Sequence, residues 1–459
     1  MSISKIPSPK SQIRFFGPRF RRSRHSPLVP LVLLAAAMGI LWAIASPPWR
    51  PNDETRHFGY VQYLSRNMSI PYPGLGWVGA NVIASENRTD YYGQVGKKET
   101  SFPPDAKQVV ASADPPLYYA LMVPVDRVFR GLSVEGQLYA VRLFGSVVIF
   151  VLLVAAAYKV GELVFPDAHY FQIGLPLLLI FHPQLLFVFT SVTNDGLVAL
   201  LYTLLLYNLI LMVKKGLSWR RVLAIGTVTG LGILTKLSFL IALPLVFVMI
   251  AILFFQEKDR RQRWRLAPRG AAALLLPVAI CGWYFFRNHL HGEVLPHIPD
   301  PTRGLNFGQV DTTKLLTGTG FTNYIIDTFL GTFSWVPLPA AAFAWFKTAI
   351  ELAAGGLGVS LLAGYWRRSW LTIRPWLALL MGSLVLVFFL AATEFEVNVA
   401  SAQGRYLFPV IVPFWSLFLA GLAGFVPPRW RPRATAALVA GFAVFGVWAL
   451  MVQFMARVS

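Results

Sequence analysis

Long apolar runs alternate with short polar segments along nearly the whole chain. An α-helix needs roughly 20 apolar residues to cross a bilayer, and eleven of the runs approach or reach that length. The pattern therefore predicts an all-α polytopic membrane protein with about eleven transmembrane helices. The expected spans are residues 28–46, 137–163, 172–190, 194–213, 221–235, 237–255, 269–287, 343–365, 374–393, 405–425 and 433–455.

Composition supports this prediction. Of the 459 residues, 56% are hydrophobic and only 14% are charged, whereas a soluble domain of this size would carry more charge. The net charge is +20, and the basic residues lie mostly in short segments between apolar runs. Anionic membrane lipids are therefore the expected partner, and nucleic acid is not. The single cysteine, Cys281, lies in an apolar run and excludes an intramolecular disulfide.

The basic connections predict the orientation of the chain. If the amino terminus is cytoplasmic, all four basic connections between spans fall on the cytoplasmic side, as the positive-inside rule requires. The carboxyl terminus is then extracytoplasmic, and we expect a multi-pass protein of the cell membrane whose first span is a retained signal anchor. The four connections are residues 214–221, 258–269, 367–374 and 429–433.

The apolar stretch 221–255 is interrupted near its middle by Thr235 and Lys236. Both of its flanks are basic, so we expect two short helices with an outer turn at Lys236. This threading leaves two long outer segments. The expected order is a basic cytoplasmic tail, the first span, an outer loop, six spans, a second outer loop and four spans, over residues 1–27, 28–46, 47–136, 137–287, 288–342 and 343–459.

The first outer loop begins with two adjacent carboxylates, Asp53 and Glu54, and His57 follows three residues later. One interpretation is structural: Asn52 or Asp53 caps an amphipathic helix that lies on the membrane surface. The other is that a carboxylate and His57, which share a helix face, belong to a site. The loop ends in a proline-rich segment at Tyr118, where a simple return into the membrane is the structural alternative.

Further polar residues stand at the outer ends of the expected spans. Asn194 and Asp195 can form a helix cap, while Lys236 and Arg405 can extend to lipid headgroups. Ionisable groups at membrane depth are nevertheless costly and often functional, and their convergence on one side favours a binding site. The expected members of that site, besides Tyr118, are Asn194, Asp195, Lys236, Asp327, Gln403, Arg405 and Tyr406.

Metal binding is not expected from the sequence. His289, His291 and His297 match no helical ligand pair and no familiar zinc spacing. Neither a glycine-rich phosphate loop nor a Ser–His–Asp arrangement stands out. The sequence therefore predicts no bound cofactor and leaves a dependence on a divalent cation open.

The order of these features resembles the type C glycosyltransferases, with protein O-mannosyltransferases and the aminoarabinose transferases of lipid A as the nearest architectures. The shared features are a carboxylate pair after the first span, two large outer loops after spans one and seven, and about eleven spans. The segment 114–119 is similar to their K-P-P-L-Y-Y-W loop motif, with Asp114 in place of the lysine.

From about Pro47 to Tyr406 the chain resembles more closely a family of bacterial membrane proteins known mainly as a domain of unknown function. The resemblance lies in short motifs that recur in the same order. They are P-x-D-E-x-x-H at 51–57, H-P-P-L-Y-Y at 114–119 with Asp114 as the departure, N-D at 194–195, L-T-K at 234–236, D-T-F at 327–329 and Q-G-R-Y at 403–406.

The resemblance implies an enzyme that takes a sugar from a polyprenyl-phosphate donor and transfers it on the extracytoplasmic face. Asp53 would act as general base with Glu54 as a supporting carboxylate, or Glu54 would be the base itself. His57 would orient a carboxylate or contact phosphate. Arg405 and Lys236 would hold the lipid phosphate and stabilise its charge as it departs. Whether the acceptor is a glycan, a lipid or a protein is left open.

The alternative is a transporter or flippase for a lipid-linked or anionic solute. Such a protein is expected to carry polar groups near the middle of the membrane. The sequence shows few there, and Glu351 has Lys347 at helical spacing as a local partner. The gathering of acidic and basic residues on the outer side favours the enzyme.

Overall fold

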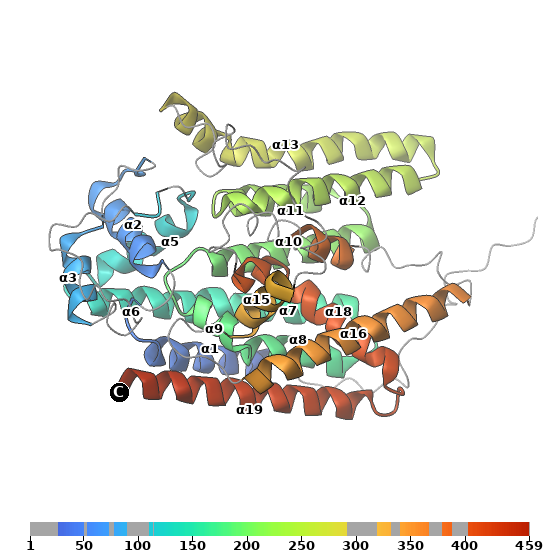
Figure 1. Ribbon diagram of the computed structural model, residues 1–459. Coiled ribbons are helices and arrows are strands. Elements are labelled where there is room, and N and C mark those ends of the chain that lie inside the picture. The colour runs from blue at the N-terminus through green and yellow to red at the C-terminus, as the bar shows by residue number, and fades with distance from the viewer. Residues whose placement is uncertain are drawn as a thin grey trace, which may run out of the picture.

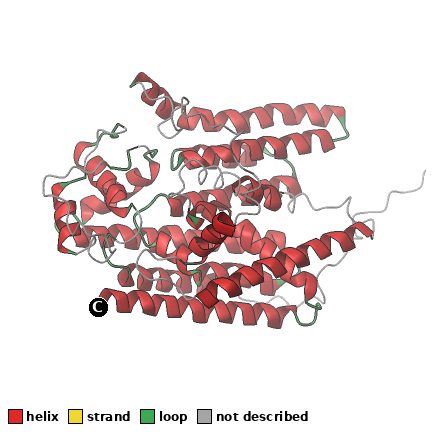
Figure 2. Ribbon diagram, in the orientation of Figure 1, coloured by secondary structure: helices red, strands yellow, loops and turns green. Residues whose placement is uncertain are grey.

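The computed structural model describes residues 26–49, 53–72, 78–89, 110–112, 114–291, 319–331, 340–366, 379–387 and 403–458. Within these ranges the regular structure is helical and contains no strand (Figure 2). The first helices are α1 (Leu28–Ala45), α2 (Glu54–Asn67), α3 (Ala80–Arg88), α5 (Leu117–Val128), α6 (Val134–Phe144), the π-helix η1 (Gly145–Phe150), α7 (Val151–Val164), α8 (His169–Ile180), α9 (Pro183–Phe189) and α10 (Asp195–Lys215). They are followed by α11 (Trp219–Ile233), the 3-10 helix η2 (Leu237–Ile241), α12 (Ala242–Gln256), α13 (Arg260–Leu290), α15 (Thr319–Leu330), α16 (Ala340–Trp366), the 3-10 helix η5 (Gly404–Val410), α18 (Ile411–Phe425) and α19 (Arg431–Val458).

The predicted membrane architecture is confirmed. Each expected span coincides with helix over most of the part that the structure describes. Seven continuous helical stretches in that part are long and apolar enough to cross a bilayer, and the bent pair α8–α9 makes an eighth. Large apolar side chains such as Leu33, Phe255 and Val444 project outward, where lipid can solvate them. The chain is a multi-pass helical membrane protein, and the count of eleven spans stays a prediction.

Two expected spans, 172–190 and 269–287, depart clearly from the helices that the structure shows. The span 172–190 is broken into α8 and α9, which meet at 61°. Pro183 begins α9, and the His182 side chain accepts a hydrogen bond from the Leu185 N–H, so both residues favour a new helix start. The span 269–287 lies within the longer helix α13, because the arginine-rich segment before it is also helical.

The helices run roughly side by side (Figure 1). In Figure 1, α2, α3 and α5 lie at the left end of the bundle, as does the carboxyl-terminal end of α19. The connections from α12 to α13 and from α18 to α19 lie at the right end. These two connections are basic, so the positive charge gathers at the end opposite α2 and α5.

Helix α2 is buried, whereas the structural interpretation of its sequence was a surface helix. Ten of its fourteen residues are buried. Its Tyr60 ring stacks on Tyr119 of α5 with centroids 3.9 Å apart. The Leu117 N–H at the start of α5 donates to the Leu234 carbonyl at the end of α11, 3.0 Å away. The outer loop is thereby joined to the membrane helices.

Glycine residues allow α16 and α18 to pack closely against each other. Gly356 of α16 and Gly421 of α18 lie so close that a Cβ atom on either would meet backbone of the other helix. Small residues allow such approach between membrane helices. The segment η5, which precedes α18, packs in the same way against α15 through Gly404. This contact places the residue after Gly404, Arg405, at the candidate site.

Candidate functional site

Asp53 stands directly before α2 in a left-handed conformation with φ 62° and ψ 8°. It occupies the cap position, but its side chain makes no capping hydrogen bond. The carboxylate instead accepts a hydrogen bond from Arg405, whose Nη2 lies 3.2 Å from Oδ2. The Asp53 side chain is 47% exposed. A non-glycine residue held in this conformation, with its carboxylate free of the helix end, is typical of a functional position.

The packing of η5 against α15 positions Arg405, the second residue of η5. The N–H of Gly404 donates to the Thr328 hydroxyl of α15 at 2.7 Å, and a Cβ on Gly404 would meet the backbone of Phe329. Within the described residues, the backbone that approaches Gly404 belongs to α15. The Arg405 side chain is only 12% exposed, and its Nε is buried with no hydrogen-bond partner among the residues that the structure describes.

Asp195 connects the two cations that the sequence singled out. Its Oδ2 lies 3.7 Å from Nη1 of Arg405, and its Oδ1 lies 2.5 Å from Nζ of Lys236. Asn194, which precedes it, donates from its side-chain amide to the Thr235 carbonyl at 3.1 Å. The four charged groups therefore alternate in sign in the order Asp53, Arg405, Asp195 and Lys236. We call this arrangement the ionic chain.

The protonation states of the ionic chain follow from its internal contacts. Burial opposes ionisation of Asp53, but Arg405 and His57 outweigh this effect and lower the pKa of the carboxyl group. Burial likewise opposes charging of Lys236, but Asp195 and Asp114 outweigh it and raise the pKa of the ammonium group. Asp53 is therefore ionised and Lys236 is charged at neutral pH.

His57 faces a tyrosine and a second carboxylate. Its Nδ1 lies 2.6 Å from the hydroxyl oxygen of Tyr119, and that hydroxyl donates to Asp114 at 3.2 Å. Burial lowers the pKa of His57, although Asp114 and Asp53 partly oppose the shift. The imidazole is therefore neutral at pH 7 and can accept or donate a hydrogen bond. Asp114, which replaces the lysine of the related loop motif, thus belongs to the surroundings of the site.

Glu54 is withdrawn from the surface. It forms an ion pair with Arg142 of α6 in which both side chains are fully buried, and the closest N–O distance is 2.5 Å. Breaking such a pair by removing one partner typically costs about 3–5 kcal/mol. Of the two roles that the sequence left open for Glu54, the geometry fits the supporting carboxylate. Sequence reasoning missed Arg142, although a charged residue inside an expected span was a usable signal.

The remaining expected site residues lie at different distances from the ionic chain. The Tyr406 ring lies beneath both cations, with its centroid 5.4 Å from Nζ of Lys236 and 5.8 Å from Arg405. Tyr118 is buried and bonds to the Thr193 backbone. Gln403 immediately precedes η5 and is partly buried. Asp327 forms a separate ion pair with Lys347 of α16 at 3.0 Å.

The described residues contain no group of three or more histidine, cysteine or acidic side chains placed to hold a metal ion. His291 stacks on Tyr72, with ring centroids 3.9 Å apart. His297 lies outside the described residues.

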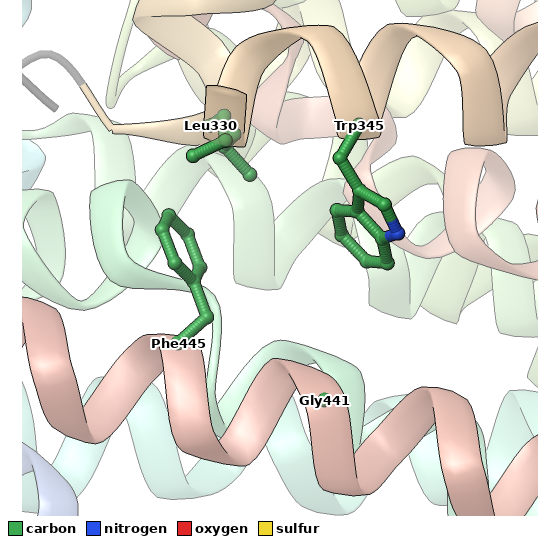
Figure 3. Close-up of a pocket in the computed structure, with 5 residues that line it drawn as sticks. Leu330, Trp345, Gly441 and Phe445 are labelled. Atoms are coloured by element: carbon green, nitrogen blue, oxygen red, sulfur yellow. The ribbon is translucent and has the colours of Figure 1, made fainter. Parts of the chain in front are cut away.

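A cavity of about 320 Å³ lies between α15, α16 and α19 rather than at the ionic chain (Figure 3). Its walls are apolar, and Figure 3 shows Leu330, Trp345 and Phe445 turned toward the same space. Leu330 is two residues beyond Thr328, which bonds to Gly404. The cavity therefore adjoins the turn of α15 that supports Arg405.

The family follows from the match over most of the sequence. The profile of the family described as "Predicted membrane protein (DUF2142)" matches residues 37–414, a range that contains the ionic chain. The chain belongs to this family. The resemblance inferred from the ordered motifs is thereby confirmed. No functionally curated protein matches the sequence.

Solved structures show which fold this family member has. The archaeal oligosaccharyltransferase AglB from Archaeoglobus fulgidus, in complex with an inhibitory peptide and a dolichol-phosphate, is similar with a TM-score of 0.51 and 15% identity. The match covers 93% of this chain and 56% of that one, so the chain spans a little over half the length of the archaeal protein. ArnT from Cupriavidus metallidurans bound to undecaprenyl phosphate has a TM-score of 0.49 and 15% identity, with coverages of 94% and 72%. The likeness to the archaeal protein shows that the fold is that of the type C glycosyltransferases.

Proposed function

We propose that this protein is a membrane glycosyltransferase that moves a sugar from a polyprenyl-phosphate-linked donor to a hydroxyl group of an acceptor on the extracytoplasmic face. The observation that carries the proposal is the contact between Asp53, which is half exposed, and Arg405, which is mostly buried. In this contact the Asp53 carboxylate, which can take up a proton, lies beside the Arg405 guanidinium, which can bind phosphate. The fold and the dolichol-phosphate in the similar archaeal structure support this choice of chemistry.

In the proposed reaction, the acceptor hydroxyl oxygen attacks the anomeric carbon of the donor sugar. The bond between that carbon and the phosphate oxygen breaks, and the polyprenyl phosphate leaves with the bonding electrons. Asp53 takes the proton of the acceptor hydroxyl. Arg405 and Lys236 bind the phosphate and stabilise the negative charge that develops on it.

The other expected residues have supporting roles in this proposal. Tyr406 lies beneath the two cations and limits where they can move. His57 orients the acceptor side of the site through Tyr119. Tyr118, Asn194 and Gln403 shape the walls, and Asp327 holds α16 near α15 through Lys347. The polyprenyl tail would lie along the apolar side of α15, next to the cavity of Figure 3.

The orientation of the chain supports an extracytoplasmic site. Asp53 directly precedes α2, which lies at the left end of the bundle in Figure 1, whereas the basic connections beside α13 and α19 lie at the right end. Basic connections favour the cytoplasmic side. Nucleotide sugars are not available on the outer side, so a lipid-linked donor fits this location.

A flippase or transporter remains the second candidate because of one observation. The break between α8 and α9 bends the path by 61° at a buried residue, His182, and broken helices are common at transport sites. The two candidates differ in their product, since a flippase moves its lipid across the bilayer without breaking the sugar–phosphate bond.

The deciding experiment is a transfer assay with the full chain in nanodiscs and a panel of synthetic polyprenyl-phosphate sugars, with membrane extract as the source of acceptor. Release of polyprenyl phosphate that requires Asp53 supports the transferase. The matched control is Asp167→Asn, an exposed carboxylate in the connection between α7 and α8. Transbilayer movement of intact donor in proteoliposomes, without release of polyprenyl phosphate by any sugar donor, would reject the transferase.

A further inference from the structure

We infer that the buried pair of Glu54 and Arg142 is a positioning device that sets the separation of the two acidic segments of the site. One segment carries Asp53 and the other carries Asp195. The inference rests on the proposed function and adds Arg142, which lies in none of the sequence motifs, to the residues on which transfer depends. Both side chains are fully buried, so they act through their neighbours.

The Glu54 carboxylate joins two segments that are far apart in sequence. Its Oε1 accepts a hydrogen bond from the Val192 N–H at 2.9 Å, and its Oε2 accepts one from the Trp49 N–H at 3.1 Å. Asp53 directly precedes Glu54, and Asp195 is three residues after Val192. One carboxylate therefore fixes the backbone on both sides of the ionic chain.

Arg142 completes the device with every nitrogen of its guanidinium. Nε donates to Glu54 Oε1 at 2.8 Å, and Nη2 donates to Oε2 at 2.5 Å. Nη1 also donates to the Ser46 carbonyl at 2.7 Å, and Nη2 to the Pro47 carbonyl at 2.9 Å. The end of α1 is thus tied to α6 and α2 at one point. A lysine has one nitrogen and cannot reproduce this fork.

The backbone conformation on either side of the pair needs support from the surrounding structure. Trp49 and Asp53 both have positive φ, at 64° and 62°. Non-glycine residues keep this conformation only where the surrounding structure determines it. The hydrogen bond from Trp49 to Glu54 spans this part of the chain. The pair therefore determines where the Asp53 carboxylate is held.

The test uses Glu54→Gln, Glu54→Asp and Arg142→Lys in the full chain, with the double variant Glu54→Gln/Arg142→Lys. Hydrogen–deuterium exchange of segments 53–58 and 192–198 reports positioning without any assumption about activity. Undecaprenyl phosphate binding and the kcat and KM of transfer report the consequence. The control is Gln172→Leu on α8, which loses a buried hydrogen bond from Gln172 to the Phe165 carbonyl and contacts none of the ionic chain.

We expect each pair variant to increase exchange in both segments. We also expect kcat to fall by about 10- to 100-fold, because small misplacements of catalytic groups are costly, while undecaprenyl phosphate affinity changes less. The double variant should be no worse than the poorer single variant, since either change breaks the same device. Glu54→Asp keeps the charge with a shorter reach and should fall between Glu54→Gln and the wild type.

Two results would overturn the inference. One is unchanged exchange in segment 192–198 in every pair variant that folds. The other is a loss of activity that matches the loss of folded protein, as in Gln172→Leu. Failure of the proposed function gives a different result: the wild type then releases no polyprenyl phosphate, whereas the exchange experiment still decides whether the pair positions both segments.

Discussion

Arg405 and Asp53 are 352 residues apart in the chain, yet Nη2 of the first lies 3.2 Å from Oδ2 of the second. The contact joins the start of α2 to the start of η5. A donor phosphate bound at Arg405 would compete with Asp53 for the same guanidinium. Donor binding would then release the carboxylate that is proposed to accept the proton, and this would couple phosphate binding to general-base catalysis.

The first prediction concerns the pH dependence of transfer. As the proposed general base, Asp53 must be ionised, so activity should be lost as the pH falls through the pKa of that carboxyl group. Burial raises this pKa, but Arg405 and His57 lower it below its usual value. Removing Arg405 should move the acidic limb of kcat/KM to higher pH. In the wild type, the acidic limb of kcat should lie at higher pH than that of kcat/KM, because bound phosphate has drawn Arg405 away.

Rate profiles for the wild type and Arg405→Ala between about pH 3 and 8 check this prediction. Asp53→Asn should lack the acidic limb and retain about 10⁻²–10⁻⁴ of the activity. An acidic limb that is the same in the wild type and Arg405→Ala would show that Arg405 does not control the protonation of the base.

The second prediction concerns the phosphate ligand. Arg405→Lys should weaken donor binding or turnover, and Arg405→Ala should weaken it further. Losing a charge-assisted hydrogen bond costs on the order of 1.5–3 kcal/mol, or about 10- to 150-fold. In Arg405, Nη2 contacts Asp53 while Nη1 reaches toward Asp195. A lysine has one side-chain nitrogen and cannot make both contacts in this geometry.

Binding of undecaprenyl phosphate to the purified chain measures this effect. The matched control is Arg433→Lys in the first turn of α19, which begins at the opposite end of the bundle, and it should bind as the wild type does. If Arg405 only extends to lipid headgroups, Arg405→Lys will also bind as the wild type does.

The helical architecture was predictable because hydropathy is a local property of the sequence. The expected span 28–46 and the helix α1 differ by one residue at the end, and the expected span 405–425 corresponds to the continuous stretch from Gly404 to Phe425. The break at His182 was missed, because the apolar run continues through it. Pro183 was the available signal, since proline often begins a helix.

The candidate site was only partly predictable. The sequence placed Asp53, Lys236 and Arg405 on one side of the membrane, but it held no information on which of them touch. That depends on how η5 packs on α15 and on how α2 is drawn into the protein. Arg142 was missed because its partner, Glu54, is 88 residues away and the pair forms only in the folded chain. The catalytic and binding roles of all these residues stay predictions.

The third prediction concerns topology. In a chain in which serine replaces Cys281, a cysteine at position 131 should react with an impermeant maleimide in intact cells. Gly131 lies in the exposed connection between α5 and α6, with nothing within 4 Å of an added Cβ. A cysteine at position 262, exposed near the start of α13, should react only after permeabilisation. Labelling of position 262 in intact cells would invert the threading and place the ionic chain inside.

The fourth prediction concerns Gly404. A Cβ at this position would meet the backbone of Phe329, which cannot move without displacing α15. Gly404→Ala should therefore push η5 away from α15, weaken the hydrogen bond to Thr328 and move Arg405 relative to Asp53. Overpacking of this kind typically costs about 1–3 kcal/mol. We expect a lower unfolding temperature in detergent. We also expect weaker undecaprenyl phosphate binding after correction for the fraction of protein that is folded.

Gly358→Ala is the matched control for this substitution. Gly358 lies within α16, and an added Cβ there has nothing within 4 Å, so alanine should leave binding unchanged and favour the helix slightly. If Gly404→Ala unfolds at the wild-type temperature and binds the lipid phosphate normally, then the contact between η5 and α15 does not determine the position of Arg405. The orientation of the guanidinium would in that case depend on its two carboxylate partners, Asp53 and Asp195, alone.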